Sequence, residues 1–293
     1  IETASMGTAG GNGDIHINDG IAWNNSSTLT LKAERDINIS ANINSTGAGK
    51  LALEYGQGAV ADGNSADYHL SQGAKVSLNA GDNFSTKLGS DGNTKQHTVI
   101  TELGDQGSTS SQDLQGIKGN LNGYYVLGGD IDASTTVSWN DGLGFTPIGT
   151  LQNKFSGGFD GLGHQIAGLV INRPDEDTVG LFGAIYQDTT VRNLGLLGGS
   201  TTGNQYVGGL VGFSWGIISN AYATGTVIGG NVVGGLAGVS SIGTISDSYA
   251  TGEVTGDYNV GGLVGSAGTI INAYATGRVT GSGNFVGGLV GGL

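Results

Sequence analysis

One six-residue phrase occurs four times in the last third of the chain at a nearly constant spacing. VGGLVG, or its variant VGGLAG, begins at Val207, Val233, Val260 and Val286, in steps of 26, 27 and 26 residues. A second phrase, YATG, recurs three times between these copies. A fixed period in the twenties, strand-like text and glycine punctuation are typical of architectures in which one repeat stacks on the next. Such a chain is more often a rod or a surface than an enzyme.

The rest of the chain also reads as short strands. In the first eighty residues, apolar residues alternate with polar or small ones, which predicts strands with one buried face. Residues 81–120 are the least regular, with one helical turn predicted at 113–117. Val179–Gly183 is a degenerate copy of the repeated phrase, so the repeats are predicted to begin at about residue 178. The segments that read as strands are 14–18, 28–31, 36–39, 50–53, 75–78, 124–127 and 155–159.

Stacking of one repeat on the next predicts an all-β parallel solenoid in which equivalent side chains form ladders. The leucine of each VGGL phrase and the alanine of each YATG phrase are predicted to form two buried ladders. The glycine pairs, such as Gly208–Gly209, are expected at sharp corners that exclude a side chain or a negative φ. Roughly 10 to 12 coils, at about 4.8 Å each, would extend over about 50 Å. The ladders are Leu210, Leu236, Leu263 and Leu289, and Ala223, Ala250 and Ala275.

Composition argues against several classes of protein. Glycine supplies 59 of 293 residues and proline only two, which fits punctuated strands rather than collagen. The net charge of −13, with 11 basic residues, argues against nucleic acid and anionic membranes as partners. No apolar run approaches the roughly 18 residues of a membrane span, so no membrane insertion is predicted. The chain contains no cysteine and therefore forms no disulfide.

The repeated phrases resemble a known family. YATG and VGGL look like the glycine-rich repeats called GLUG motifs, which occur in large bacterial surface proteins. The segment Phe155–Leu169 is similar to the stretch that often leads into such arrays. Gly13–Ile15 and Leu29–Ile37 resemble the body of filamentous-haemagglutinin-like adhesins exported by two-partner secretion, although the secretion-recognition cap of those proteins is missing. The resemblance implies a right-handed parallel β-helix and a role in adhesion or in a biofilm matrix.

The chain divides into three predicted segments. Haemagglutinin-like coils are expected at 1–80, irregular transition coils at 81–177 and GLUG-type coils at 178–293. The chain begins without a signal peptide and ends inside a repeat. We therefore expect a processed or trimmed piece of a longer polypeptide, truncated at its C-terminus.

Three tyrosines recur in register and are the candidate ligand-binding residues. Tyr222, Tyr249 and Tyr274 each lie between two small residues of a predicted strand, which places them on the opposite face from those residues. If the small residues fill a narrow core, the tyrosines point outward and form an aromatic strip able to stack on sugar rings. If the tyrosines point inward, they form a core ladder. The column that begins at Asn220 and recurs in the next two repeats is predicted to be a turn or a hydrogen-bond ladder.

No catalytic residue and no metal ligand is predicted. The four histidines are scattered, and His164 is interpreted, with nearby Asp160, as part of a tight turn. Calcium stays open as a cofactor because oxygen ligands bind hard cations, but no EF-hand or RTX spacing is present. A glycan-cleaving β-helix would need two or three carboxylates on neighbouring coils. The histidines are His16, His69, His97 and His164, and the acids suited to such a site are Asp130, Asp132, Asp141, Asp160, Asp175, Glu176, Asp177 and Asp188.

These features predict a non-catalytic segment of a large secreted bacterial surface adhesin or biofilm-matrix protein, located outside the cell or on its surface. It would act as a stiff stalk and a repetitive display surface. The expected partners are polysaccharide of a host, a neighbouring cell or the matrix, and an outer-membrane transporter during export. The alternative is a carbohydrate-active β-helix lyase or hydrolase. An ice- or mineral-binding solenoid is a third interpretation, which rests on the single column of Thr224, Thr251 and Thr276.

Overall fold

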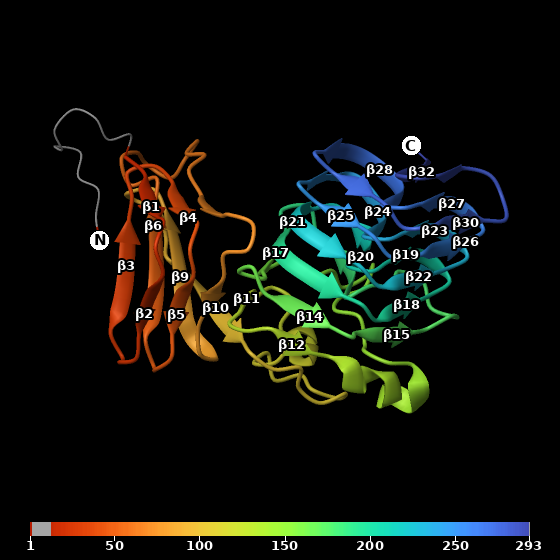
Figure 1. Cartoon of the computed structure of the whole chain (residues 1–293), viewed down its shortest axis with the longest axis horizontal. Helices are drawn as coiled ribbons and strands as arrows, with labels where there is room; N and C mark the ends of the chain where they lie inside the picture. Colours follow the sequence, from red (N-terminus) through yellow and green to blue (C-terminus); the bar gives the residue numbers. More distant parts are fainter. Residues whose placement is uncertain (2–12, 293) are drawn as a thin grey trace. The chain divides into compact units, whose positions relative to one another are not determined.

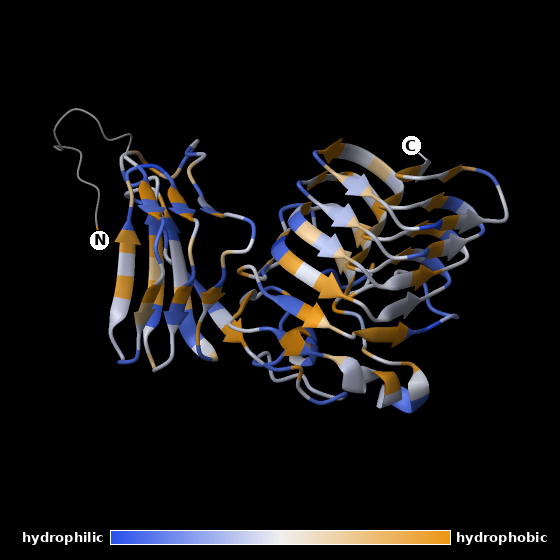
Figure 2. Ribbon diagram, in the orientation of Figure 1, coloured by the Kyte–Doolittle hydropathy of each residue, from blue (hydrophilic) through white to orange (hydrophobic). Residues whose placement is uncertain are grey.

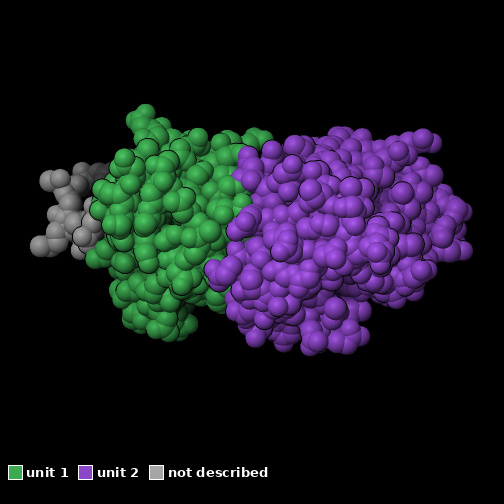
Figure 3. Space-filling view, turned by 90° about the horizontal axis from the view of Figure 1, so that it is seen from below, with its two compact units in different colours: residues 1–101, 124–129, 162–164 green, residues 102–123, 130–161, 165–293 purple. Residues whose placement is uncertain are grey.

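The computed structural model describes residue 1 and residues 13–292, which form an all-β protein with two 3-10 helices in that part of the chain. The chain divides into two compact units, coloured green and purple in Figure 3. Unit 1 comprises Ile1–Thr101, Tyr124–Gly129 and Leu162–His164. Unit 2 comprises Glu102–Gly123, Asp130–Gly161 and Gln165–Leu293. The division into segments 1–80, 81–177 and 178–293 stays a prediction.

Unit 1 is built from short strands, most of which pair in parallel with strands further along the chain (Figure 1). Its ladders run β1–β4–β7, β2–β5–β8 and β3–β6–β9. Ile15 and Ile17 are buried while His16 between them is exposed, the alternation that the sequence predicts. The strands are β1 (Ile15–Ile17), β2 (Ile21–Trp23), β3 (Thr28–Lys32), β4 (Ile37–Ile39), β5 (Ile43–Ser45), β6 (Lys50–Tyr55), β7 (Tyr68–Leu70), β8 (Val76–Ser77), β9 (Gly81–Leu88), β10 (Lys95–Ile100) and β11 (Tyr124–Leu127).

Residues 81–100 are more regular than the sequence predicts. Here β9 and β10 pair in antiparallel register, and β10 pairs in parallel with β11. Polar residues dominate β9, and Phe84 is its only buried apolar side chain, so the period-two pattern is weak in the sequence. The helical turn predicted at 113–117 is observed as the 3-10 helix η1 (Gln115–Gly119).

Unit 2 contains the repeats, and its strands pair in parallel with equivalent strands of the next repeat (Figure 1). One sheet has the order β15–β18–β22–β26–β30 and a second has the order β19–β23–β27–β31. A third group holds the longest strands and links β17, β21, β24 and β28 in parallel. The elements are β12 (Ile131–Asp132), η2 (Ser134–Gly142), β13 (Gly158–Asp160), β14 (Gln165–Ala167), β15 (Val170–Asn172), β16 (Phe182–Ile185), β17 (Thr190–Leu197), β18 (Ser200–Thr202), β19 (Gln205–Gly208), β20 (Val211–Ser214), β21 (Ile217–Ala223), β22 (Thr226–Ile228), β23 (Asn231–Gly234), β24 (Ala237–Ser246), β25 (Tyr249–Ala250), β26 (Val254–Gly256), β27 (Tyr258–Gly261), β28 (Val264–Ile271), β29 (Tyr274–Ala275), β30 (Val279–Gly281), β31 (Val286–Gly287) and β32 (Val290–Gly292).

Within the repeats of unit 2, the core contains equivalent residues from successive repeats. The predicted leucine ladder is fully buried in its first three members and 36% exposed at Leu289, in the last repeat. The predicted alanine ladder is buried at Ala223 and Ala250 and half-buried at Ala275. Figure 2 shows the alternation of apolar and polar residues along the strands that this packing requires. The valines of the repeated phrase pair in register in the order Val207, Val233, Val260 and Val286.

The corners of the repeats differ from the prediction. The residue before the valine of each copy has a left-handed backbone, with φ of 55°, 56°, 51° and 63° at Tyr206, Val232, Asn259 and Phe285. The glycine pairs have no left-handed φ, so the expectation that they supply the corner dihedrals is wrong. They are required by close packing instead, because a Cβ on Gly208 would lie 2.6 Å from the Cα of Ala237.

The third glycine of each copy packs against the corner of the preceding repeat. A Cβ on Gly238 would lie 2.6 Å from the carbonyl carbon of Tyr206. A Cβ on Gly265 would lie 2.7 Å from the equivalent atom of Val232. Real Cβ atoms do not approach backbone this closely. Glycine is therefore needed wherever a left-handed corner meets the repeat stacked on it.

Candidate functional site

The three tyrosines singled out in the sequence form one continuous stack. Tyr222 in β21, Tyr249 in β25 and Tyr274 in β29 are direct partners in parallel register. Both neighbouring pairs of rings have centroids 5.0 Å apart, with interplanar angles of 4° and 5°. We call this set the tyrosine ladder. Its regularity follows from the register, because parallel pairing sets the same side chain at the same place in each repeat.

The tyrosine ladder lies on the outer face of its sheet. Ala221 and Ala223, on either side of Tyr222, are 1% and 3% exposed and belong to the core. Alternation along the strand therefore turns the tyrosine away from the core. Tyr222 and Tyr249 are half-buried by the stacking, and Tyr274 is 52% exposed. Of the two directions left open by the sequence, the outward one is observed.

Two residues that the sequence analysis missed support the first ring of the ladder. Gly195 in β17 is the strand partner of Tyr222, and a Cβ on Gly195 would overlap the tyrosine ring. The Tyr222 hydroxyl donates a hydrogen bond to Oε1 of Gln165 at 3.2 Å. Gln165 is in turn the partner of Gly195 in the adjacent strand β14. The spacing in the sequence could have identified Gly195, because it stands one repeat length, 27 residues, before Tyr222.

The stacking determines which parts of the rings a ligand can reach. Both faces of Tyr249 are covered by neighbouring tyrosines, and one face of Tyr222 lies over Gly195. Along most of its length the ladder therefore offers ring edges and hydroxyl groups to solvent. Burial raises the pKa of Tyr249, and the neighbouring Tyr222 and Tyr274 hydroxyls raise it further. A raised pKa keeps this hydroxyl protonated and able to donate a hydrogen bond.

A hydrogen-bonded polar column runs beside the ladder, as the sequence predicted. Asn220 donates to Oδ1 of Asn193 at 2.7 Å, and Asn272 donates to Oδ1 of Asp247 at 3.3 Å. All four residues have a left-handed backbone, with φ between 48° and 52°. Asn and Asp tolerate this conformation better than other residues with a side chain. The column is therefore a structural turn repeated through the stack.

Asp160 ends this polar column and has structural partners. Its carboxylate accepts hydrogen bonds from Nε of Arg192 at 2.7 Å and from Nδ2 of Asn193 at 3.0 Å. Asp160 is 5% exposed, so the ion pair with Arg192 lies largely away from water. A buried carboxylate requires such partners. The pairing gives Asp160 a structural role that needs no catalytic step.

The other acids of the alternative enzymatic interpretation are spread over several places. Asp130 accepts a hydrogen bond from the backbone of Gln165. Asp132 accepts hydrogen bonds from the backbone and side chain of Ser134, which lower its pKa. Glu176 and Asp177 do share a hollow of about 350 Å³. Their carboxylates bind Arg173 at 2.7 Å and Asn204 at 2.8 Å, respectively.

The histidines are held by different local contacts. His164 is 4% exposed and its Nε2 lies 3.0 Å from the carbonyl oxygen of Val76. His97 is 8% exposed and its Nε2 lies 3.0 Å from Oγ1 of Thr86. Within residues 1 and 13–292, no group of three or more His, Asp or Glu residues is arranged to hold a metal ion. The structure therefore offers no cluster in that part of the chain to which a calcium ion, left open by the sequence, could be assigned.

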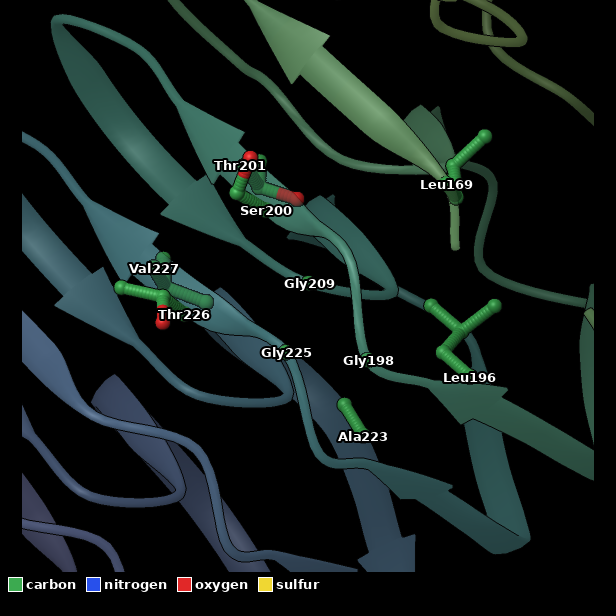
Figure 4. Close-up of a pocket in the computed structure, with 10 residues that line it drawn as sticks. All are labelled: Leu169, Leu196, Gly198, Ser200, Thr201, Gly209, Ala223, Gly225, Thr226 and Val227. Carbon is green, nitrogen blue, oxygen red and sulfur yellow. The ribbon is translucent and has the colours of Figure 1, made fainter. Parts of the chain in front are cut away.

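A small, partly open pocket lies where the strands of unit 2 turn a corner (Figure 4). Leu169, Leu196 and Ala223 contribute to its lining, together with glycines that include Gly209 and Gly225. Its volume of about 10 Å³ is at the lower limit for one water molecule. The pocket is a packing feature and is too small for a ligand.

Comparisons with known proteins identify the repeats. Residues 203–228 and 256–280 match the GLUG motif. Halomucin from Haloquadratum walsbyi is 44% identical over 141 residues, which are 45% of this chain and 2% of the relative. A putative Gly-rich membrane protein from Evansella cellulosilytica is 40% identical over 100 residues, which are 33% of this chain and 12% of the relative. This chain thus spans only a small part of either relative.

The comparisons bear differently on the other expectations. No solved structure matches the chain. Neither of the two relatives is named as a filamentous-haemagglutinin-like adhesin, so that resemblance and two-partner secretion stay predictions. Among the described residues, no helix has the length and apolar character needed to cross a membrane. What the comparisons establish is that this all-β chain carries GLUG repeats.

Proposed function

We propose that the chain is a non-catalytic, stalk-like segment of a large surface-associated protein and that its repeats form a right-handed parallel β-helix. The observation that carries this proposal is the unbroken register of equivalent residues, from Val207 to Val286 in one sheet and from Tyr222 to Tyr274 in another. Such register stacks every repeat on its neighbours through backbone hydrogen bonds, which gives a stiff rod. The names of the halomucin and Gly-rich membrane relatives support a surface location.

Spin labels can test the stacking. The chain has no cysteine, so cysteines introduced at chosen positions are the only sites that a thiol-specific nitroxide labels. Ser219 is the strand partner of Ser246, and Ser246 is the partner of Ile271. Labels at 219 and 246 should show strong spin–spin broadening, because neighbouring strands lie about 4.8 Å apart. Labels at 219 and 271, two repeats apart, should broaden less, and equal broadening of the two pairs would contradict the stacking.

The second part of the proposal is that the tyrosine ladder displays a binding surface for extracellular polysaccharide of a host, a neighbouring cell or the matrix. Its ring centroids recur every 5.0 Å on an outer face, and each ring carries one hydroxyl that can donate to and accept from sugar hydroxyls. Export through an outer-membrane transporter and a role in adhesion or biofilm belong to the same proposal. No metal or other cofactor is needed for this role.

A glycan array with two triple variants tests the display surface. Replacing Tyr222, Tyr249 and Tyr274 by Phe keeps the stacked rings and removes the hydroxyls, whereas replacement by Ala removes both. If the hydroxyls bind glycan, both variants lose binding; if ring edges suffice, only the Ala variant does. Circular dichroism checks that each variant is folded. Binding that survives in the folded Ala variant would exclude the ladder as the site.

A glycan-cleaving enzyme is the alternative function, and the hollow beside Glu176 and Asp177 is the observation that favours it. Two carboxylates in one hollow are the minimum that glycoside hydrolysis requires. Incubation with the glycans of the array, followed by chromatography of the soluble products, separates the two functions. Release of soluble products by the unmodified chain, together with its loss in a Glu176→Gln, Asp177→Asn double variant, would favour the enzyme over the stalk.

A further inference from the structure

We propose that the tyrosine ladder is a site of oxidative cross-linking, at which hydrogen peroxide couples neighbouring tyrosines into dityrosine and so joins successive repeats covalently. This modification is independent of glycan binding. It needs tyrosines that are close together, held in place and accessible to the oxidant. The ladder meets each of these requirements.

Proximity is set by the backbone. Tyr222, Tyr249 and Tyr274 are register partners, so their rings are neighbours in every folded molecule. The ring centroids are 5.0 Å apart in both pairs. Rotation about the side-chain bonds turns one ring edge towards the next, and the two ortho carbons can then meet. Because both partners belong to one chain, coupling does not depend on protein concentration.

Accessibility distinguishes the ladder from a second close pair. In unit 1, the ring centroids of Tyr55 and Tyr68 are 5.8 Å apart, but Tyr68 is only 3% exposed. Two other tyrosines, Tyr186 and Tyr258, are 45% and 53% exposed. Neither stacks on another tyrosine among the residues that the structure describes. Among the described tyrosines, only those of the ladder stack on another tyrosine without either ring of the pair being fully buried.

Formation of each dityrosine bond consumes one molecule of hydrogen peroxide. A peroxidase transfers one electron and one proton from each of two phenols, and hydrogen peroxide is reduced to two molecules of water. The two phenoxyl radicals then combine through their ortho carbons. Loss of the ring hydrogens at those carbons to the phenol oxygens restores both aromatic rings. One carbon–carbon bond forms, and the protein loses two hydrogen atoms.

The product would link residues 27 or 25 positions apart in the sequence, since the ladder runs from Tyr222 to Tyr249 to Tyr274. Each link closes one repeat onto the next on the outside of the stack. A covalent link of this kind restricts the unfolded chain and therefore favours the folded state. The coupled protein should unfold at a higher temperature than the untreated protein.

Peptide mapping by mass spectrometry tests the proposal. The full chain is treated with peroxidase and dilute hydrogen peroxide, and the monomer is isolated by gel filtration before digestion. Peptides joined with the loss of two hydrogen atoms are expected between Tyr222 and Tyr249 or between Tyr249 and Tyr274. The Tyr249→Phe variant, which keeps the ring but cannot form a phenoxyl radical, should lose both links. The matched Tyr258→Phe variant should keep them.

Two results would overturn the proposal. One is a monomer in which the ladder tyrosines remain uncoupled although Tyr186 and Tyr258 have been oxidised. The other is coupling at the ladder that persists at the same yield in denaturant, because the folded register would then contribute nothing. Glycan binding by the untreated protein does not bear on either result, so failure here leaves the proposed display function intact.

Discussion

The ring of Tyr222 lies directly over Gly195, its partner in the neighbouring strand. Any other residue at position 195 would displace the ring, because even a Cβ would occupy the space of the ring. The same end of the ring is held by the hydrogen bond from its hydroxyl to Gln165. Tyr222 therefore fixes the position from which Tyr249 and Tyr274 continue the stack.

Gly195→Ala should displace the Tyr222 ring and destabilise the protein. The added methyl group either shifts the ring or strains the backbone, and such overpacking typically costs about 1–3 kcal/mol. Chemical denaturation followed by circular dichroism measures the change in the free energy of unfolding. The control is Gly107→Ala, where a Cβ would meet no atom within 4 Å. A Gly195→Ala variant as stable as this control would contradict the described contact.

Gly238→Ala should destabilise the repeats more strongly than an alanine at an open glycine. Its Cβ would press on the backbone of Tyr206 and Val207, both at 2.6 Å, and backbone atoms cannot move away as a flexible side chain can. We expect a loss of about 2–4 kcal/mol in the free energy of unfolding. Gly288→Ala is the matched control within the repeats, because nothing lies within 4 Å of its Cβ. The free energy of unfolding of both variants is measured by chemical denaturation. Equal values for Gly238→Ala and Gly288→Ala would show that Gly238 does not pack against the corner of the preceding repeat.

Val232→Asn should stabilise the protein. Val232 has φ of 56°, a conformation that is unfavourable for a β-branched residue, whereas Asn259 occupies the equivalent corner of the next repeat at 51°. Relief of this strain is worth about 1 kcal/mol. The reverse change, Asn259→Val, should cost a similar amount. Thermal unfolding measures the stability of both variants. If both substitutions stabilised the protein, or both destabilised it, relief of strain at the left-handed corner would not be the cause.

Stability should fall as the pH rises through the range in which Tyr249 ionises. Burial and the neighbouring tyrosines raise the pKa of this group above its ordinary value of 10.0. Above pH 10 the unfolded chain loses the proton first, so the folded state loses stability until the pH exceeds the raised pKa. Tyr249→Phe should therefore lose less stability between about pH 9 and pH 11 than the wild type. An identical loss in both proteins would contradict the raised pKa.

The periodic parts of the fold could be predicted from the sequence because a repeat imposes one environment on each equivalent residue. The residues on either side of Tyr222 are alanines. If these alanines are buried, alternation along the strand predicts that the Tyr222 ring points outward, and this is the direction observed. The leucine ladder follows from the same argument, apart from the exposed Leu289. These predictions needed only the period and the two faces of a strand.

The remaining features depend on tertiary contacts that leave no chemical signature. The left-handed corners are occupied by Tyr, Val, Asn and Phe, so residue type does not mark them. Gly195 belongs to a segment without the YATG phrase, and its role appears only when Tyr222 is placed above it. The face-to-face stacking of the tyrosines was also missed, because alternation gives the direction of a side chain but not the orientation of its ring.

Single-molecule force spectroscopy tests the stalk most directly. The chain is held by its two termini and extended, and the length released in each unfolding event is measured. A stack of repeats should resist and then unravel in discrete steps, each of about 90 Å for one repeat of 26 or 27 residues. The Gly238→Ala variant should lower the force of those steps. Smooth extension at low force, without steps of this length, would contradict the account of the chain as a stiff stalk.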